Sequence, residues 1–521
     1  MGRRRTFLKL MSAGTVAAGL PPRSARAFVP AHNWDRYDWG TAPPVRERLN
    51  QGPFPQYAPE EVIPGSDVVM ATTPSPDVVP GFGTGLVTYV TGDFAGGTFR
   101  GKDPEREIEA FASLPLGQKL YLRPTWRELQ KRPGRLDPDA YWKITFAKAR
   151  EHGKRVGFRV MMSDPDIAEP ALPDFVLEKV PMVRLAGEWK GEANAVRHRK
   201  VHEEPRYDHP SFQEAFRELN TLLAAELNGS PLVEYVDTFM YGFWGEGHTW
   251  PFTNHPFPDA LTAERTFVRM FEVQLEHWTR TPLVTNTQPD FSRVGNAELV
   301  DRTIRSHNWL RTDTIFIENE QVEAISNRPP WVAAVLEVGM SDGSPESLRI
   351  DEEVTHTDNS IAHVMDVGAN YWSLWNWHRE SAANVTAYYR QYPEMIDTIA
   401  RRIGYRVRPS LVWRYDGGGR TGLVVGFAND GIAGVPGVLR VSVVDEAGTA
   451  LAGGGLDPGY PLPGRIRQAQ FPLPAGTPWN GLRLKAEIEV KDVRYPVRWA
   501  CRQKLEEDGS LRLRPTRGIG G

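Results

Sequence analysis

Between Gly85 and Gly404, short apolar runs rich in β-branched residues alternate with amphipathic segments, and this alternation restricts the possible folds more than any other feature of the chain. Strands that alternate with helical segments are typical of βα units around a parallel sheet. Eight such units over roughly 300 residues predict an α/β fold, a (β/α)8 barrel. The eight runs are Leu86–Val90, Lys119–Leu122, Val156–Met161, Val233–Met240, Pro282–Thr285, a less regular one at Trp309–Ile315, Trp331–Leu336 and Ala369–Trp375.

Helix signals fall between these runs, as a barrel requires. N-capping residues indicate where a helix begins, and apolar side chains at helical spacing indicate its buried face. Four helices are expected: one opened by Asp137 and Pro138 and ending near Gly153, one with Phe212, Phe216, Leu219 and Leu223 on a single face, one over Thr262–Trp278, and one over Asn384–Ile403 closed by Gly404.

The sequence changes in character on both sides of the barrel segment. Residues 28–80 are rich in Pro, Trp and Asp and show little periodicity, so we expect an N-terminal extension there. Residues 405–515 contain alternating runs such as Val438–Val444 and Arg483–Val490, separated by Gly and Pro clusters, which predict a small C-terminal β-sandwich. The catalytic barrel is therefore expected over residues 81–404.

The first 27 residues resemble an export signal rather than part of the fold. Arg4-Arg5-Thr6-Phe7-Leu8-Lys9 matches the twin-arginine pattern, and Ala25-Arg26-Ala27 supplies a small-x-small cleavage site. We expect the twin-arginine translocase as a partner and a periplasmic or secreted mature protein. No later segment approaches ~18–20 consecutive apolar residues, so no stable membrane insertion is expected.

Composition excludes several classes of function. The 62 Lys and Arg residues nearly balance 65 Asp and Glu residues, which argues against a nucleic-acid partner. The single cysteine, Cys501, excludes an intramolecular disulfide and any multi-cysteine metal site. His198 and His202 have helical spacing but lie among basic residues, so a solvated loop is expected there rather than a metal site.

No cofactor is expected, because the chain has no Walker A loop and the segment Gly81-Phe-Gly83-Thr-Gly85 lacks the spacing of a dinucleotide-binding fingerprint and precedes a strand rather than following one. By contrast, 16 Trp, 16 Tyr and 22 Phe residues in a hydrophilic chain favour a carbohydrate-active protein, in which aromatic faces stack on sugars.

Candidate catalytic residues were sought at the carboxyl ends of the barrel strands, where barrel enzymes carry their sites. The fourth run leads into Tyr241-Gly-Phe-Trp-Gly-Glu246-Gly-His248, where glycines allow close approach and aromatic neighbours are expected to raise a carboxyl pKa. The seventh run is followed directly by Glu337, an ionisable group after five apolar residues. Either glutamate could instead be a structural carboxylate paired with an arginine.

Two carboxylates at the barrel mouth predict glycoside hydrolysis. If they lie ~5–5.5 Å apart, one protonates the leaving oxygen while the other attacks the anomeric carbon, with retention of configuration. We assign Glu246 as acid/base and Glu337 as nucleophile. Glu318 and Glu320, just past the sixth run, are alternatives for the second carboxylate.

These residues carry a resemblance to clan A glycoside hydrolases, whose catalytic glutamates lie on strands 4 and 7. Tyr121-Leu-Arg-Pro-Thr-Trp126 is similar to the strand-2 region of β-galactosidase-like members. Over roughly residues 80–500 the chain more closely resembles a bacterial family of barrel-plus-β-sandwich proteins. That family has a Gly-x-Trp-Gly-Glu motif at strand 4, an Asp near the end of strand 6, here Asp313, and a Glu on strand 7. The resemblance implies a glycosidase that acts on an oligo- or polysaccharide.

Further substrate-binding candidates follow from position in the predicted barrel. Arg123 is expected either to orient the nucleophile or to form a core salt bridge. Alternation places Trp372 and Trp375 on opposite sides of the eighth strand, so one of them is expected to form a sugar platform. The remaining candidates for substrate contact, each with packing as the alternative, are Trp126, Trp244, His248 and Asp313.

One departure from the clan pattern supports a different function. Clan A enzymes usually have Asn directly before the acid/base, where it contacts the sugar 2-hydroxyl, and this chain has Gly245. The alternative is a non-catalytic saccharide-binding barrel that has kept an aromatic cleft without the chemistry.

Overall fold

The computed structural model describes most residues of the predicted barrel and of the C-terminal region. The predicted signal, most of the predicted extension, and His198, Asp313, Glu318, Glu320 and Trp375 lie outside the described residues. The residues that the structure describes are 67–90, 103–186 without 166 and 168, 202–249, 252, 254–287, 293–312, 324–337, 356–374, 381–417 and 419–514.

Eight parallel strands close into a barrel, which confirms the predicted fold class. Each of the eight apolar runs contributes one strand, and the strands pair with their neighbours in chain order, with the last, β11, paired to the first, β2. The barrel strands are β2 (Gly85–Tyr89), β3 (Lys119–Leu122), β4 (Arg155–Phe158), β7 (Val233–Asp237), β8 (Leu283–Asn286), β9 (Trp309–Thr312), β10 (Ala334–Leu336) and β11 (Tyr371–Ser373).

Helices lie between the barrel strands, and none of those in the described part of the chain is both long and apolar enough to cross a bilayer. The apolar face predicted around Phe212 and Phe216 is buried against the barrel, as expected. The helices are α6 (Pro104–Ala112), α7 (Trp126–Leu129), α8 (Ala140–Glu151), α9 (Asp174–Leu177), α10 (Pro210–Leu227), α11 (Ala260–His277), α12 (Arg293–Arg305), α14 (His356–Asp366), α15 (Ala382–Gln391) and α16 (Pro393–Arg402).

Two helix boundaries differ from the prediction. The N-cap of α8 is Asp139, whose carboxylate accepts a hydrogen bond from the Trp142 amide at 3.1 Å, rather than Asp137. The helix predicted over Asn384–Ile403 is two helices, because Pro393 has no amide hydrogen to continue α15 and instead begins α16.

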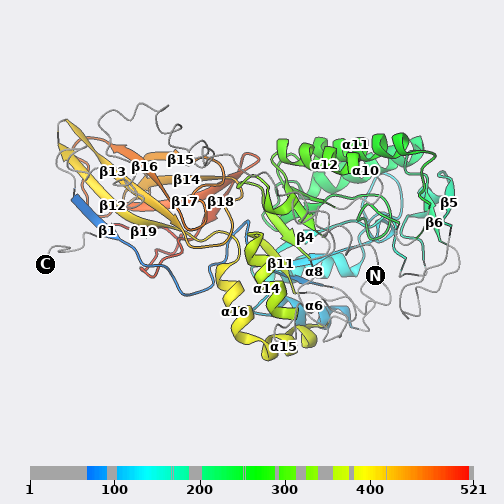
Figure 1. Ribbon diagram of the computed structural model, residues 1–521, viewed down its shortest axis with the longest axis horizontal. Helices are drawn as coiled ribbons and strands as arrows, with labels where there is room; N and C mark the ends of the chain where they lie inside the picture. The colour runs from blue at the N-terminus through cyan, green and yellow to red at the C-terminus, as the bar shows by residue number, and fades with distance from the viewer. Residues whose placement is uncertain are drawn as a thin grey trace, which may run out of the picture. The chain divides into compact units, whose positions relative to one another are not determined.

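The C-terminal region forms two antiparallel sheets whose inner faces share one core. One sheet contains a strand from the predicted extension: β1 pairs with β12, beside which it lies in Figure 1. The apolar segment Val68–Ala71, within the expected N-terminal extension, therefore belongs to this sheet. The strands are β1 (Asp67–Ala71), β12 (Val407–Gly417), β13 (Arg420–Asn429) and β16 (Ile466–Leu473) in one sheet, and β14 (Val438–Val444), β15 (Ala450–Gly455), β17 (Arg483–Val490), β18 (Val493–Val497) and β19 (Leu511–Arg512) in the other.

The core of these sheets continues into the barrel. Tyr495 of β18 stacks on Phe82, just before β2, with ring centroids 3.5 Å apart. The guanidinium of Arg155, at the start of β4, lies 5.0 Å from the Tyr495 ring. These contacts lie at the amino ends of the barrel strands, so the sheets are joined to the barrel at the end opposite to Glu246.

Candidate active site

A tight turn after β7 holds Glu246 at the mouth of the barrel. We call residues 241–248 the Glu246 turn. Within it Gly242, Trp244, Gly245 and Gly247 all have positive φ, between 52° and 85°. A Cβ on Gly242 would lie 2.0 Å from the carbonyl oxygen of His248, so only glycine allows the two ends of the turn to approach this closely.

Arg123, which follows β3, brings the two predicted catalytic glutamates together. Its Nη1 donates to Oε1 of Glu246 at 3.0 Å, and its Nη2 donates to Oε1 of Glu337. The exposed fractions of Glu246 and Glu337 are 6% and 2%. One guanidinium therefore links carboxylates that enter the site from β7 and β10, nearly 100 residues apart in the sequence.

A second arginine also contacts Glu246. The Nη1 atom of Arg159, just after β4, donates to Oε1 of Glu246 at 3.0 Å, and its Nη2 lies 3.3 Å from Oδ2 of Asp237. Asp237 is the last residue of β7 and is completely buried. Sequence reasoning missed both residues, although each is a charged group inside a predicted strand run, Arg159 in Val156–Met161 and Asp237 in Val233–Met240.

A third arginine completes the described network. Arg311 of β9 pairs with Glu337 through Nη2 and with Asp237 at 3.2 Å through Nη1. The hydroxyl of Tyr89 accepts a hydrogen bond from Arg311 at 2.6 Å, and Tyr121 donates to Asp237. Burial, the largest influence, raises the pKa of Tyr89 to about 12, so this hydroxyl stays protonated at neutral pH. In this network the guanidiniums of Arg123, Arg159 and Arg311 face the carboxylates of Asp237, Glu246 and Glu337.

The prediction that the pKa of Glu246 is raised is wrong. Burial raises it, but the positive charges of Arg123 and Arg159 and a hydrogen bond to His248 outweigh burial and lower the pKa to about 2. The sequence showed the aromatic neighbours of Glu246 but not the arginines, which come from other strands. Glu246 is therefore a carboxylate in the resting site.

Trp244 and His248 are brought to the site with Glu246. Nε2 of His248 lies 3.3 Å from Oε2 of Glu246, and the rings of Trp244 and His248 have centroids 5.9 Å apart. Trp244 has φ 52°, a conformation that bulky residues seldom adopt and that is concentrated at functional sites. Its amide donates to the carbonyl oxygen of Ser163 at 2.9 Å, which holds the residue in this conformation.

Trp126 and Trp372 are not brought to the site. Trp126 begins α7, is fully buried, and donates from Nε1 to Gln130 at 2.9 Å. Trp372 is in register with Leu86 and Leu336 and is buried with them in the core between the barrel and its helices. Strand alternation points its side chain away from the barrel interior, so Trp372 is not the one of the two candidate residues that could form a sugar platform.

His202 does not lie in a solvated loop, contrary to the prediction. Its side chain is buried and packs against aromatic rings, with centroids 4.9 Å from Phe252 and 5.9 Å from Phe243. The basic residues that suggested exposure precede it in the chain, whereas His202 itself leads into β6 (Glu203–Pro205), which pairs with β5 (Met182–Arg184).

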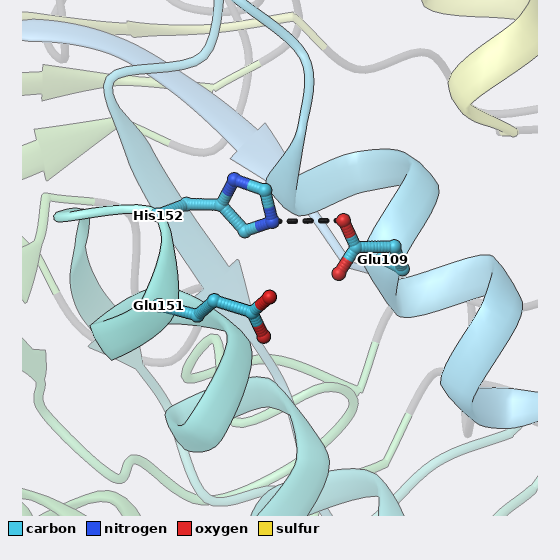
Figure 2. A group of neighbouring side chains, drawn as sticks. All are labelled: Glu109, Glu151 and His152. Carbon is cyan, nitrogen blue, oxygen red and sulfur yellow. Dashed lines mark hydrogen bonds and ion pairs between the residues drawn. The ribbon is translucent and has the colours of Figure 1, made fainter.

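One group of side chains outside the barrel mouth has the composition of a metal site. Glu109 of α6 and Glu151 and His152 at the end of α8 converge as Figure 2 shows, with Nε2 of His152 2.9 Å from Oε1 of Glu109. The ammonium group of Lys148 lies 2.9 Å from Glu109 and 3.1 Å from Glu151, where it supplies the positive charge. We interpret the group as a surface ion-pair cluster that links α6 to α8.

Comparisons with known proteins give no family. No protein-family model and no curated protein matches the chain. The solved structures that it resembles include a GH5_18 protein from Streptomyces cattleya, with 12% identity over 60% of this chain and 81% of that chain and a TM-score of 0.37. Endo-glycoceramidase II from Rhodococcus sp. has 12% identity over 75% of this chain and 97% of that chain, with a TM-score of 0.36.

Morphinone reductase has the same TM-score of 0.36, with 11% identity over 57% of this chain and 86% of that chain. Likenesses of this size, shared by glycosidases and a reductase, indicate no particular reaction for this chain.

Proposed function

We propose that this protein is a glycoside hydrolase of the retaining type that acts on an oligo- or polysaccharide. The observation that carries the proposal is the contact of one guanidinium, Arg123, with both Glu246 and Glu337. This closeness favours the retaining arrangement, in which the two carboxyl groups are ~5–5.5 Å apart, over the wider inverting one.

Glu337 is the nucleophile in this proposal. Arg123 donates a hydrogen bond to one oxygen of Glu337, and the guanidinium of Arg311 forms an ion pair with the other. These contacts stabilise and orient a carboxylate anion. Attack on the anomeric carbon forms a glycosyl-enzyme ester as the leaving oxygen takes up a proton and departs. Water then cleaves the ester, which restores the Glu337 carboxylate and releases the sugar with net retention.

Proton transfer is assigned to Glu246 together with His248. With a pKa of about 2, Glu246 does not hold a proton in the resting site. The imidazole of His248 lies 3.3 Å away, and imidazole ordinarily titrates in the physiological range. We therefore assign delivery of the first proton to the pair and deprotonation of the attacking water to Glu246.

The low pKa of Glu246 also favours the second candidate, a non-catalytic saccharide-binding barrel. Carboxylates held by arginines on several sides are common as structural ion pairs inside barrels, and such pairs perturb pKa values without any catalytic role. In that case the aromatic mouth around Trp244 would bind sugar without cleaving it.

The deciding experiment is a screen of the purified protein on aryl glycosides and on plant and microbial polysaccharides. Turnover that is lost in Glu337→Ala supports the hydrolase. Calorimetric binding of an oligosaccharide without turnover of any substrate would contradict it and support the binding barrel.

A further inference from the structure

Glu204 is a buried carboxyl group close to the proposed site that the reaction does not use. It lies on β6, where alternation exposes its neighbour Glu203 and leaves Glu204 only 1% exposed. The hydroxyl of Ser163 contacts one carboxyl oxygen, and the hydroxyl of Tyr207 donates to the other at 2.6 Å. Both oxygens of Glu204 therefore have partners.

Both partners of Glu204 also hold the Glu246 turn. The hydroxyl of Tyr207 accepts a hydrogen bond from the Gly242 amide at 2.9 Å. The carbonyl oxygen of Ser163 accepts one from the Trp244 amide, also at 2.9 Å. Glu204 thus connects, through one residue on each side, to two backbone positions within the turn that carries Glu246.

We propose that Glu204 is a positioning residue for Glu246, which it orients by holding the Glu246 turn through Ser163 and Tyr207. This inference rests on the proposed function, because the orientation of Glu246 matters only if Glu246 takes part in the reaction. A displacement of about 1 Å at a reacting group lowers a rate by as much as ~10²-fold, so an anchor of this kind acts on kcat.

Both hydroxyls donate to Glu204, Ser163 to one oxygen and Tyr207 to the other, so the carboxyl group accepts on both sides. Burial raises the pKa of Glu204 to about 7, and it is the largest influence; the hydroxyls of Ser163 and Tyr207 and the charge of His248 act in the opposite direction. Below pH 7 the group is mainly protonated, and the proton is lost as the pH rises through about 7.

Other ionisable groups near Glu204 come from the elements packed around it. Two of them are His248 of the Glu246 turn and Tyr207. Glu204 also lines a cavity of about 430 Å³, whose other ionisable lining residues are Asp164, Glu169, His202 and Glu203. Arg184 of β5, opposite Glu203, is exposed. Ser163 and Tyr207 still donate to the ionised carboxylate, so we expect the anchor to remain in place after Glu204 loses its proton.

The kinetic test compares Glu204→Ala and Glu204→Gln with wild type and with Glu203→Gln as the exposed control. We expect Glu204→Ala to lower kcat on the order of 10–10²-fold with KM changed less than about 2-fold. Glutamine offers one acceptor oxygen to the two donors, so Glu204→Gln should lower kcat by less than Glu204→Ala does. Wild-type kcat in both Glu204 variants would overturn the proposal.

A second readout does not depend on turnover. Hydrogen exchange of the peptide that contains Gly242 and Trp244 should become faster in Glu204→Ala and in Tyr207→Phe, which keeps the aromatic ring, and stay unchanged in Glu203→Gln. Unchanged exchange in both variants would refute the anchor. If exchange changes as expected while wild type cleaves no glycoside, the anchor stands and the proposed function fails.

Discussion

The residue before Glu246 explains why this chain departs from the clan A pattern. Gly245 has φ 73°, and a Cβ at this position would lie 3.1 Å from Cδ of Arg159. Asn tolerates positive φ better than most residues, but its Cβ would press on the stem of the arginine that holds Glu246. An Asn that contacts a sugar 2-hydroxyl is therefore poorly compatible with Arg159 in its present place.

The two glutamates should differ in their dependence on the leaving group. Proton donation matters most for a poor leaving group, whereas the nucleophile is needed for every substrate. We expect Glu246→Gln to remain glycosylated by a dinitrophenyl glycoside but to lose turnover of natural substrate by a factor on the order of 10²–10⁴. Glu337→Gln should lose both reactions, as measured by burst kinetics and mass spectrometry.

Azide distinguishes Glu337 from the alternative Glu318. A small anion attacks from the face vacated by the nucleophile, so Glu337→Ala with azide should yield a glycosyl azide of inverted configuration. If Glu318→Ala shows this rescue while Glu337→Ala retains near-normal activity, Glu337 is a structural carboxylate.

At the scale of elements, patterns within short stretches predicted the fold well. Each barrel strand overlaps one of the eight predicted runs, and the face of α10 follows from the spacing of Phe212 and Phe216. The prediction failed where a single residue overrides a pattern, as Pro393 does between α15 and α16. It also failed for β1, because its pairing partner β12 lies more than 300 residues away.

The candidate site was predictable only in part. Glu246 and Glu337 each stand out in their own segments, and the structure brings them together. The ion pairs that set their environment were not predictable, because Arg159 and Arg311 belong to other strands and pairing across a barrel leaves no local signal. The choice between Trp372 and Trp375 could not be made from the sequence, because alternation shows that two residues face opposite ways but not which one faces inward.

The close approach within the Glu246 turn can be tested at Gly242. We expect Gly242→Ala to abolish activity while leaving the far-ultraviolet circular dichroism nearly unchanged, because the added methyl meets the His248 carbonyl. Gly134→Ala is the matched control, since Gly134 has φ 80° but nothing within 4 Å of an added Cβ. If both variants lose activity equally, the loss comes from the strained backbone conformation of alanine at positive φ, and contact with the His248 carbonyl is not its cause.

For the molecule as a whole, the shared core between barrel and sheets should supply stability without acting on the reaction. Removing the buried ring by Tyr495→Ala should cost about 3 kcal/mol, as large-to-small core substitutions do, and lower the thermal midpoint. We expect kcat/KM at 25 °C to stay near wild type. Arg494→Ala, an exposed neighbour on β18, should change little, and a large loss of kcat/KM in Tyr495→Ala would contradict the separation of roles.

Export through the twin-arginine pathway remains a proposal, since residues 1–27 lie outside the described part of the chain. Replacing Arg4 and Arg5 by Lys should leave the precursor in the cytoplasm, as fractionation and immunoblotting would show. Mass spectrometry of the exported protein should find Phe28 at its amino terminus. An intact Met1 on periplasmic material would disprove cleavage after Ala27.

The equal numbers of guanidiniums and carboxylates in the described network have an evolutionary consequence. Removing one member leaves the opposite charge in a medium of low dielectric, which commonly costs ~3–5 kcal/mol, whereas replacing both members of a pair by apolar residues is often nearly neutral. Substitutions at Arg311 and Glu337 should therefore show strong epistasis, each harmful alone and much less so together. In homologues that have lost the proposed hydrolysis, Arg311 and Glu337 should therefore be replaced together. In homologues that retain it, both residues should be kept.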